Sequence, residues 1–264
     1  MNLQIMFDAL KATTGDSTAV SRFSNRAENY ARFRPGYPAE IFPFLEAELS
    51  LTKDTHIVDI GSGTGLFAEP LLERGFSVTG IEPNEDMRKV AESRLKKYSS
   101  FESINATAEE TGLAVNSRGL ITIAQTFHWL DPLATRLECK RILTSGGHVV
   151  LAWNREKGDS EFEQKYNALR EKYGIAQRSS VQVDPVLIAD FFSPNTSTTK
   201  IFPNKQLLDF EALKGQLLSK SYIPLPGHES YDAMITDLIR LFVHYNENGL
   251  VGIEYETLVI WGRL

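Results

Sequence analysis

The sequence predicts an α/β fold that is built around a mostly parallel sheet. Short apolar and β-branched runs recur along the first 154 residues, and helix-like stretches lie between them. Strands that alternate with helices in this way indicate parallel pairing with right-handed crossovers. The run at 149–153 is apolar throughout, which is typical of a strand that is covered on both faces.

The predicted elements follow one another in a regular order. The predicted strands lie at 56–60, 77–82, 101–106, 119–125 and 146–154. The predicted helices lie at 65–75, 84–99 and 132–147. The first helix ends at Gly75, a residue that favours a helix C-terminus, and Asp131 before Pro132 is a typical start for the third. Asn84 precedes acidic residues and later basic ones, which suits the dipole of the second helix.

The chain after Asn154 has a different character. Residues 160–174 and 230–249 have helical periodicity, 191–210 mixes turn residues with strand-like pieces, and 254–264 has a strand pattern. Because no linker or repeat separates this part, we expect one domain over 1–264 with a helical and strand insertion at about 155–250.

Composition narrows the classes of partner. The 264 residues carry a formal net charge of −6 with both signs interleaved, whereas a nucleic-acid surface is usually a basic face. The single cysteine, Cys139, is expected to be buried, and alone it makes neither a disulfide nor a multi-cysteine zinc site. The start has no signal-peptide order, and no apolar run approaches the roughly 20 residues of a membrane span. We therefore expect a cytoplasmic protein without nucleic-acid or membrane partners.

A glycine-rich loop follows the first predicted strand. Gly61, Gly63 and Gly65 come directly after "HIVDI", where an open parallel sheet presents its ligand site. Glycine lets a ligand approach the main chain closely, because it has no Cβ. A dinucleotide fingerprint needs G-x-G-x-x-G, but Leu66 occupies the slot of its third glycine, and no Gly-Lys-Ser/Thr of a P-loop follows.

The pattern D-x-G-x-G-x-G at 59–65 resembles motif I of the class I S-adenosylmethionine-dependent methyltransferases. The resemblance implies a Rossmann-like fold with a mostly parallel seven-stranded sheet, helices on both faces and an antiparallel last strand. It also implies S-adenosyl-L-methionine as cofactor, S-adenosyl-L-homocysteine as product and no metal. The cofactor-binding residues that it implies are Asp59, Gly61, Ser62, Gly63, Gly65, Glu82, Asn84, Met87, Ala108, Glu109 and Gln125.

Further segments resemble one branch of this family. They are "NYARFRPGYP" at 29–38, "AQTFHWLDP" at 124–132, "SKSYIPLPG" at 219–227 and "YETLVIWGRL" at 255–264. Together they are similar to type-11 methyltransferases close to the trans-aconitate methyltransferase group, over roughly residues 22 to 264. One departure is Gly119-Leu120 at the fourth strand, where these proteins often begin with Asp.

The resemblance also implies an acceptor site beside the cofactor. An N-terminal lid at 22–40 would cover it, and the insertion at about 155–250 would enclose it. The acceptor and lid candidates are Tyr30, Arg34, Tyr37, His128, Trp129, Ser221 and Tyr222. Arg34 or Arg32 can pair with an anionic acceptor. His128 is the candidate catalytic base, because an ordinary imidazole titrates near neutral pH, but a histidine between Phe127 and Trp129 can equally be a packed residue.

The function that follows is methyl transfer to a small molecule, with a carboxylate as one candidate acceptor group. Two alternatives stay open: a non-catalytic protein that binds S-adenosylmethionine or S-adenosylhomocysteine, and a nicotinamide-dependent oxidoreductase. The identity of the acceptor, the attacked atom and the oligomeric state do not follow from the sequence.

Overall fold

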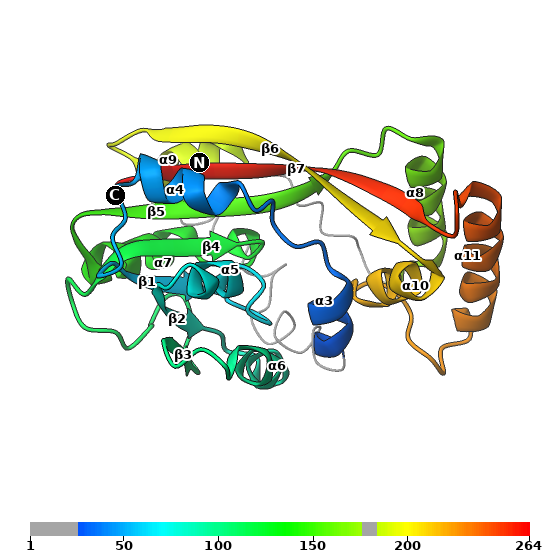
Figure 1. The fold of residues 1–264 in the computed structure, drawn as a ribbon, viewed down its shortest axis with the longest axis horizontal. Coiled ribbons are helices and arrows are strands. Elements are labelled where there is room, and N and C mark those ends of the chain that lie inside the picture. The colour runs from blue at the N-terminus through cyan, green and yellow to red at the C-terminus, as the bar shows by residue number, and fades with distance from the viewer. Residues whose placement is uncertain (1–25, 176–183) are drawn as a thin grey trace, which may run out of the picture.

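A computed structural model describes residues 26–175 and 184–264 of the chain. Its centre is a seven-stranded sheet with the order β3-β2-β1-β4-β5-β7-β6 (Figure 1). The strands are β1 His56–Ile60, β2 Ser77–Ile81, β3 Phe101–Ile104, β4 Arg118–Ala124, β5 Leu143–Glu156, β6 Ser197–Leu208 and β7 Val251–Gly262. Strands β1 to β5 pair in parallel, and β7 runs antiparallel to both of its neighbours. The predicted fold class, with its antiparallel last strand, is confirmed.

The described helices cover both faces of this sheet. They are α3 Ala27–Phe33, α4 Ile41–Glu48, α5 Ala68–Glu73, α6 Glu85–Leu95, α7 Pro132–Ile142, α8 Glu161–Tyr173, α9 Pro185–Phe192, α10 Phe210–Leu218 and α11 Tyr231–Tyr245, with a 3₁₀ turn at Phe127–Trp129. Asp131 accepts hydrogen bonds from the backbone of the first turn of α7, as the sequence predicts. None of these helices is long and apolar enough to cross a membrane.

Two apolar cores lie on opposite faces of the sheet. Helices α7 and α9 pack over Leu151 and Trp153 of β5, and Cys139 is buried there as expected. Helices α4 and α5 pack over the other face, against Val150 and Trp261. Adjacent residues of β5 therefore point to opposite cores, which is why this strand is apolar along its length.

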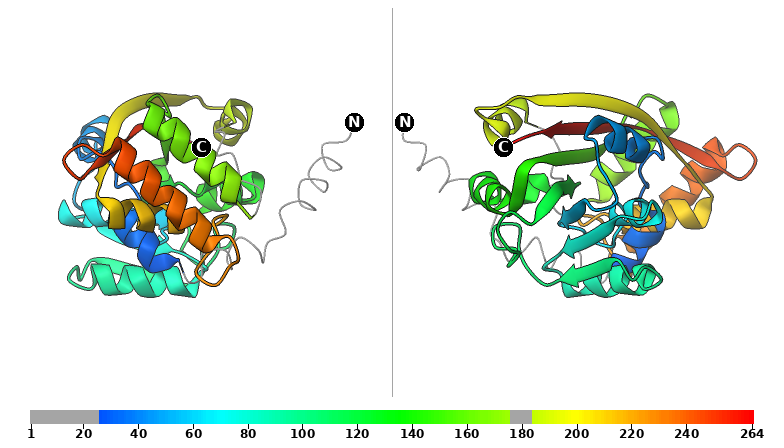
Figure 2. Two further views of the ribbon diagram at one scale, coloured as in Figure 1. Left: turned by 90° about the vertical axis from the view of Figure 1, so that its right-hand side faces the viewer. Right: turned by 60° about the vertical axis from the view of Figure 1, so that its left-hand side comes forward.

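The three last strands of the sheet extend beyond its core and carry a helical cluster. Helices α8, α10 and α11 pack around Tyr255 of β7 in a third apolar cluster, which lies at one end of the long strands (Figure 2). Met234 and Leu238 of α11 are fully buried in it, one helical turn apart. The range 155–250 is therefore not one insertion as expected, because α9 and β6 belong to the sheet and its covering layer.

The segment expected to form the lid begins as a helix. Residues 22–25 of the predicted lid lie outside the described part of the chain, and residues 27–33 form α3, which packs against α10. Arg26, just before α3, is buried, and its guanidinium donates to the carbonyls of Leu218, Lys220 and Ile223 at 2.9, 2.7 and 2.7 Å. A Cβ on Gly215 would lie 2.1 Å from the ring of Phe33, so α3 and α10 are in close contact.

Candidate active site

The glycine loop lies where the carboxyl ends of β1, β2 and β4 meet. The backbone amides of Gly61 and Ser62 donate to the carbonyl of Ile81 at 2.8 and 3.1 Å, which fixes the loop to the end of β2. All three glycines have positive φ, at 65°, 54° and 79°. The loop therefore has the left-handed conformations that favour glycine at 61, 63 and 65.

The three glycines have different neighbours. A Cβ on Gly61 would overlap the side chain of Thr126, and a Cβ on Gly65 would lie 2.6 Å from Leu95 of α6. A Cβ on Gly63 would meet only the carbonyl oxygen of Gly61, at 4.0 Å. Packing thus explains Gly61 and Gly65, whereas Gly63 has open space where a ligand can lie against the main chain.

Glu82 is fixed beside Gly63 at the end of β2. Its Oε2 accepts the Gly63 amide at 3.0 Å, and its Oε1 accepts the Asn84 amide at 2.9 Å. Burial raises the pKa of this carboxyl, and the two backbone amides oppose that rise. Each carboxylate oxygen keeps acceptor capacity, so Glu82 can also receive two hydroxyl groups, which is the arrangement that a ribose requires.

Asp59 has the most unusual environment in the loop. Its side chain is 1% exposed; its Oδ1 accepts the Thr122 hydroxyl at 2.6 Å, and its Oδ2 has no partner among the described residues. Burial raises the pKa of Asp59 to about 7; the bond from Thr122 opposes the rise and the charge of Glu82 adds to it. A cationic ligand at Oδ2 would supply the missing partner, since buried carboxylates are normally paired.

Two more predicted cofactor residues lie at the start of α6. The Asn84 side chain caps this helix by accepting the Met87 amide at 3.0 Å, and both residues are buried. Ser62 packs on β2, where a Cβ on Gly80 would lie 2.7 Å from its Oγ. Their contact with a cofactor stays a prediction.

The other predicted cofactor residues lie on the far side of the loop. Ala108 is buried in the core beneath α7, and Glu109 accepts the Asp131 amide at 3.2 Å. Gln125 has a positive φ of 58°, and its side-chain amide donates to the Asn154 carbonyl at 3.2 Å. Next to it, the Thr126 hydroxyl donates to the Gly61 carbonyl at 3.1 Å, so this turn contacts the glycine loop directly.

These residues fit S-adenosylmethionine. Asp59 offers an unpartnered buried carboxylate oxygen to the ammonium group, and Gly63 offers an open stretch of main chain. Glu82 offers a preorientated carboxylate to the two ribose hydroxyls. In the described part of the chain no group of three or more His, Cys, Asp and Glu side chains is arranged to hold a metal ion.

His128 lies in the 3₁₀ turn after β4, with its ring 5.0 Å from that of Trp129. Burial lowers its pKa to about 4, and its Nδ1 is buried without a partner among the residues described. The imidazole is therefore neutral at pH 7 and is a weak base. Its role as the catalytic base stays a prediction, and the environment favours a hydrogen-bonding role instead.

The segment from Arg34 to Tyr37 runs from α10 to the glycine loop. The carbonyl of Gly36 accepts the side-chain amides of Asn154 and Asn204 at 3.1 and 2.9 Å. The Tyr37 ring packs edge-on against Phe67 at 4.8 Å, and burial raises its pKa, with the nearby charge of Asp59 adding to the rise.

The other lid and acceptor candidates lie around this segment. At its far end the Arg34 guanidinium lies over the Tyr30 ring at 4.9 Å. Arg32 is exposed and lies against Phe33. Ser221 and Tyr222 form the turn after α10, where the Tyr222 carbonyl accepts the Ile175 amide at 2.9 Å.

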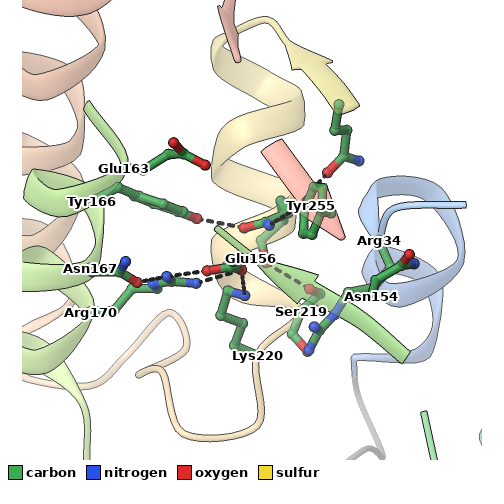
Figure 3. A network of polar contacts seen from close by, with 12 residues as sticks. Arg34, Asn154, Glu156, Glu163, Tyr166, Asn167, Arg170, Ser219, Lys220 and Tyr255 are labelled. Atoms are coloured by element: carbon green, nitrogen blue, oxygen red, sulfur yellow. Dashed lines mark hydrogen bonds and ion pairs between the residues drawn. The ribbon is translucent and has the colours of Figure 1, made fainter. Parts of the chain in front are cut away.

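The structure also contains a charged cluster that the sequence analysis missed. Glu156 at the end of β5, Arg170 of α8 and Lys220 after α10 come together beside Arg34 (Figure 3). The only local signal is that Glu156 lies two residues beyond the end of a predicted strand. Arg170 and Lys220 are 14 and 64 residues away from it, so no spacing pattern could connect the three.

Comparison with known proteins agrees with this geometry. Residues 58–151 match the family model described as a methyltransferase domain. An uncharacterized methyltransferase of Mycobacterium tuberculosis is 33% identical over 132 residues, which cover 50% of this chain and 51% of that protein. The chain thus spans about half the length of the first curated relatives it matches. An uncharacterized methyltransferase-like protein of Schizosaccharomyces pombe is 24% identical over 244 residues, covering 89% and 93% of the two chains.

A solved structure has the same fold. It is a provisionally assigned type II methyltransferase from Anaeromyxobacter dehalogenans, with a TM-score of 0.66, 19% identity and coverage of 88% and 98%. At this identity the likeness shows the fold alone. The family match over residues 58–151 and the shared fold support a class I S-adenosylmethionine-dependent methyltransferase domain of the type-11 branch, as the sequence predicts. The closer similarity to trans-aconitate methyltransferases stays a prediction.

Proposed function

We propose that this protein is an S-adenosylmethionine-dependent methyltransferase that acts on a small-molecule acceptor. The observation that carries the proposal is the convergence of Asp59, Gly63 and Glu82 at the ends of β1 and β2. One is a buried carboxylate without a partner at Oδ2, one is open main chain, and one is a fixed carboxylate.

When bound, S-adenosylmethionine supplies an electrophilic methyl group on a positively charged sulfur. The chain's own residues hold the reactants in position. Asp59 and Glu82 fix the two ends of the donor, and Tyr37 beside them excludes water. Alignment of two reactants can contribute about 7–11 kcal/mol to a bimolecular step, so a site without a strong base can still be effective.

The acceptor is proposed to be small because α3, which contacts α6 beside the glycine loop, is also packed closely on α10. A carboxylate is a favoured acceptor group, because it needs no deprotonation and His128 is a weak base. The same proposal includes a cytoplasmic location. It also includes the absence of nucleic-acid partners, because the net charge is −6 and acidic and basic residues are interleaved along the chain.

Calorimetric titration with S-adenosylmethionine, followed by turnover screening on pools of small metabolites, tests this function. We expect saturable donor binding and formation of S-adenosylhomocysteine with at least one acceptor pool. Donor binding without consumption in every pool would favour a non-catalytic binding protein. Binding of a reduced nicotinamide cofactor in place of the donor would favour an oxidoreductase.

A further inference from the structure

Three buried charged side chains meet beside the lid. Arg170 is 1% exposed and donates to both carboxylate oxygens of Glu156, at 2.9 and 2.5 Å. Lys220 is 5% exposed, and its Nζ donates to Oε1 of the same carboxylate at 2.9 Å (Figure 3). The three residues come from a strand, a helix and a turn, so only the folded chain brings them together.

The cluster has one carboxylate and two basic groups. With Lys220 protonated, Glu156 would face two buried cations. The other buried carboxylate of α8, Glu163, accepts bonds from Ser160 and from the Glu254 amide instead. An unmatched buried charge is costly unless a partner neutralises it. Burial, opposed by Glu156 and helped by the charges of Arg170 and Arg34, lowers the pKa of Lys220 well below its ordinary value. The empty site therefore favours the neutral amine, and an anion bound beside Lys220 would favour its ammonium form.

Arg34 adds a third cation on the same side. Its Nη2 lies 3.5 Å from the Ser219 carbonyl, which is a long and weak hydrogen bond. Its Nε is buried and has no hydrogen-bond partner in the described part of the chain. The Arg34 guanidinium stacks on the Tyr30 ring, and this contact does not use the N–H groups of the guanidinium. Arg34 therefore has an unused donor close to Lys220.

The cluster lies within reach of the donor site. From Arg34, three residues lead to Tyr37, whose phenol is near Asp59, and an extended chain of this length spans about 10 Å. On β5, Glu156 lies two residues beyond Asn154 and on the same face of the strand. Asn154 in turn contacts Gln125, which follows β4 at the glycine loop.

We propose that Lys220 and Arg34 together bind an anionic group of the methyl acceptor, and that Glu156 and Arg170 position Lys220 for this task. The inference rests on the proposed function and adds the residues that select the acceptor. A carboxylate held by two cations is a poor nucleophile. The anchored anion is therefore a different group from the one that receives the methyl, and it fixes the acceptor from the side away from the donor.

The test measures anion binding by the protein saturated with S-adenosylhomocysteine. The probes are acetate, benzoate, succinate, glutarate and inorganic phosphate, with succinamide and glutaramide as neutral controls. We expect at least one anion to bind and the amides not to bind. In Lys220→Gln the affinity for that anion should fall at least tenfold. Lys220→Arg should keep it within about threefold, and Lys214→Gln, on the more exposed face of α10, should leave it unchanged.

The melting temperature distinguishes anion binding by Lys220 from a purely structural role of this residue. Glu156 stays paired with Arg170 in Lys220→Gln, so we expect the ligand-free variant to melt at the same temperature as the parent or higher. A lower melting temperature together with unchanged anion affinity would overturn the proposal. If Lys220→Gln does not fold, Arg34→Gln decides: a tenfold loss of anion affinity supports the proposal, and no loss overturns it.

The result also distinguishes this inference from the proposed function. If the parent protein does not bind S-adenosylhomocysteine, the proposed function fails. If it binds that compound normally but binds none of the anions, only the role of Lys220 and Arg34 is overturned.

Discussion

Folding strongly alters the ionisation of Asp59. Its pKa rises from 3.8 to about 7 because the carboxyl is buried. The unfolded chain therefore loses this proton first as pH rises, so the stability that Asp59 contributes is complete below pH 4 and is lost by about pH 7. A cationic ligand group at Oδ2 would favour the ionised carboxylate and so lower the pKa of Asp59 again. The protonation of Asp59 therefore couples protein stability to donor binding.

Replacement of Asp59 by Asn tests this link. Asn resembles the protonated carboxyl, so we expect the ligand-free variant to match the parent near pH 4 and to exceed it at pH 8, by up to about 4 kcal/mol of unfolding free energy. S-adenosylhomocysteine should bind the variant more weakly. Urea unfolding across this pH range, with calorimetric titration at pH 8, provides both values. An equal difference in unfolding free energy at pH 4 and pH 8 would show that folding does not raise the pKa of Asp59.

Replacement of Glu82 by Gln tests the contact of this carboxylate with the ribose of the donor. Two hydrogen bonds to a charged group contribute about 1.5–3 kcal/mol each, so Glu82→Gln should weaken donor binding by about a hundredfold or more. Glu85→Gln is the matched control, because Glu85 begins α6 nearby and is 68% exposed. Calorimetric titration of both variants with S-adenosylhomocysteine gives the comparison. Equal affinities would remove Glu82 from the site.

The sequence predicted the donor residues better than the acceptor residues, for a physical reason. Asp59, Gly63 and Glu82 each follow or end a strand, and parallel strands bring such positions together in any fold of this kind. Lys220 and Arg170 lie on elements whose packing depends on the whole chain. The raised pKa of Asp59 and the lowered pKa of His128 depend on burial, which spacing alone does not reveal.

At the scale of elements, periodicity predicted the central strands and five helices, whereas α3, α4, α9 and α10 were missed; α3 and α10 show why. Pro35 and Pro38 favoured an extended segment near α3, and Gly215 weakened the helical pattern of α10. In the structure a glycine is favourable at position 215, because Phe33 of α3 occupies the space that a side chain would need. Tertiary contact therefore overrides local propensity in both helices.

This contact predicts the effect of Gly215→Ala. The added Cβ would lie 2.1 Å from the Phe33 ring, so α3 must shift, and we expect a loss of about 1–3 kcal/mol of stability. The higher helix propensity of Ala would by itself stabilise α10 by up to about 1 kcal/mol. The measurement is denaturant unfolding together with protease sensitivity around 26–37. Gly36→Ala, where nothing lies within 4 Å, serves as the control; an unchanged Gly215→Ala protein would contradict the packing of α3 on α10.

At the scale of the whole molecule, β6 and β7 belong both to the sheet and to the helical cluster of α8, α10 and α11, and Glu156 of β5 is paired with Arg170 of α8. Because the same strands support both parts, we expect one cooperative unfolding transition. Scanning calorimetry should give equal calorimetric and van't Hoff enthalpies. A saturating donor at 100 times its Kd should add about 2.7 kcal/mol of stability to that single transition. Two resolved transitions would show that the helical cluster unfolds separately.

The central claim is that the donor lies along the main chain at Gly63 with its ribose at Glu82. The most direct measurement is a crystal structure of the protein grown with S-adenosylhomocysteine. We expect the ribose hydroxyls within hydrogen-bond distance of the Glu82 carboxylate and the amino group beside Oδ2 of Asp59. Density for the compound at another place in the molecule, or none at this loop under saturating conditions, would contradict the account.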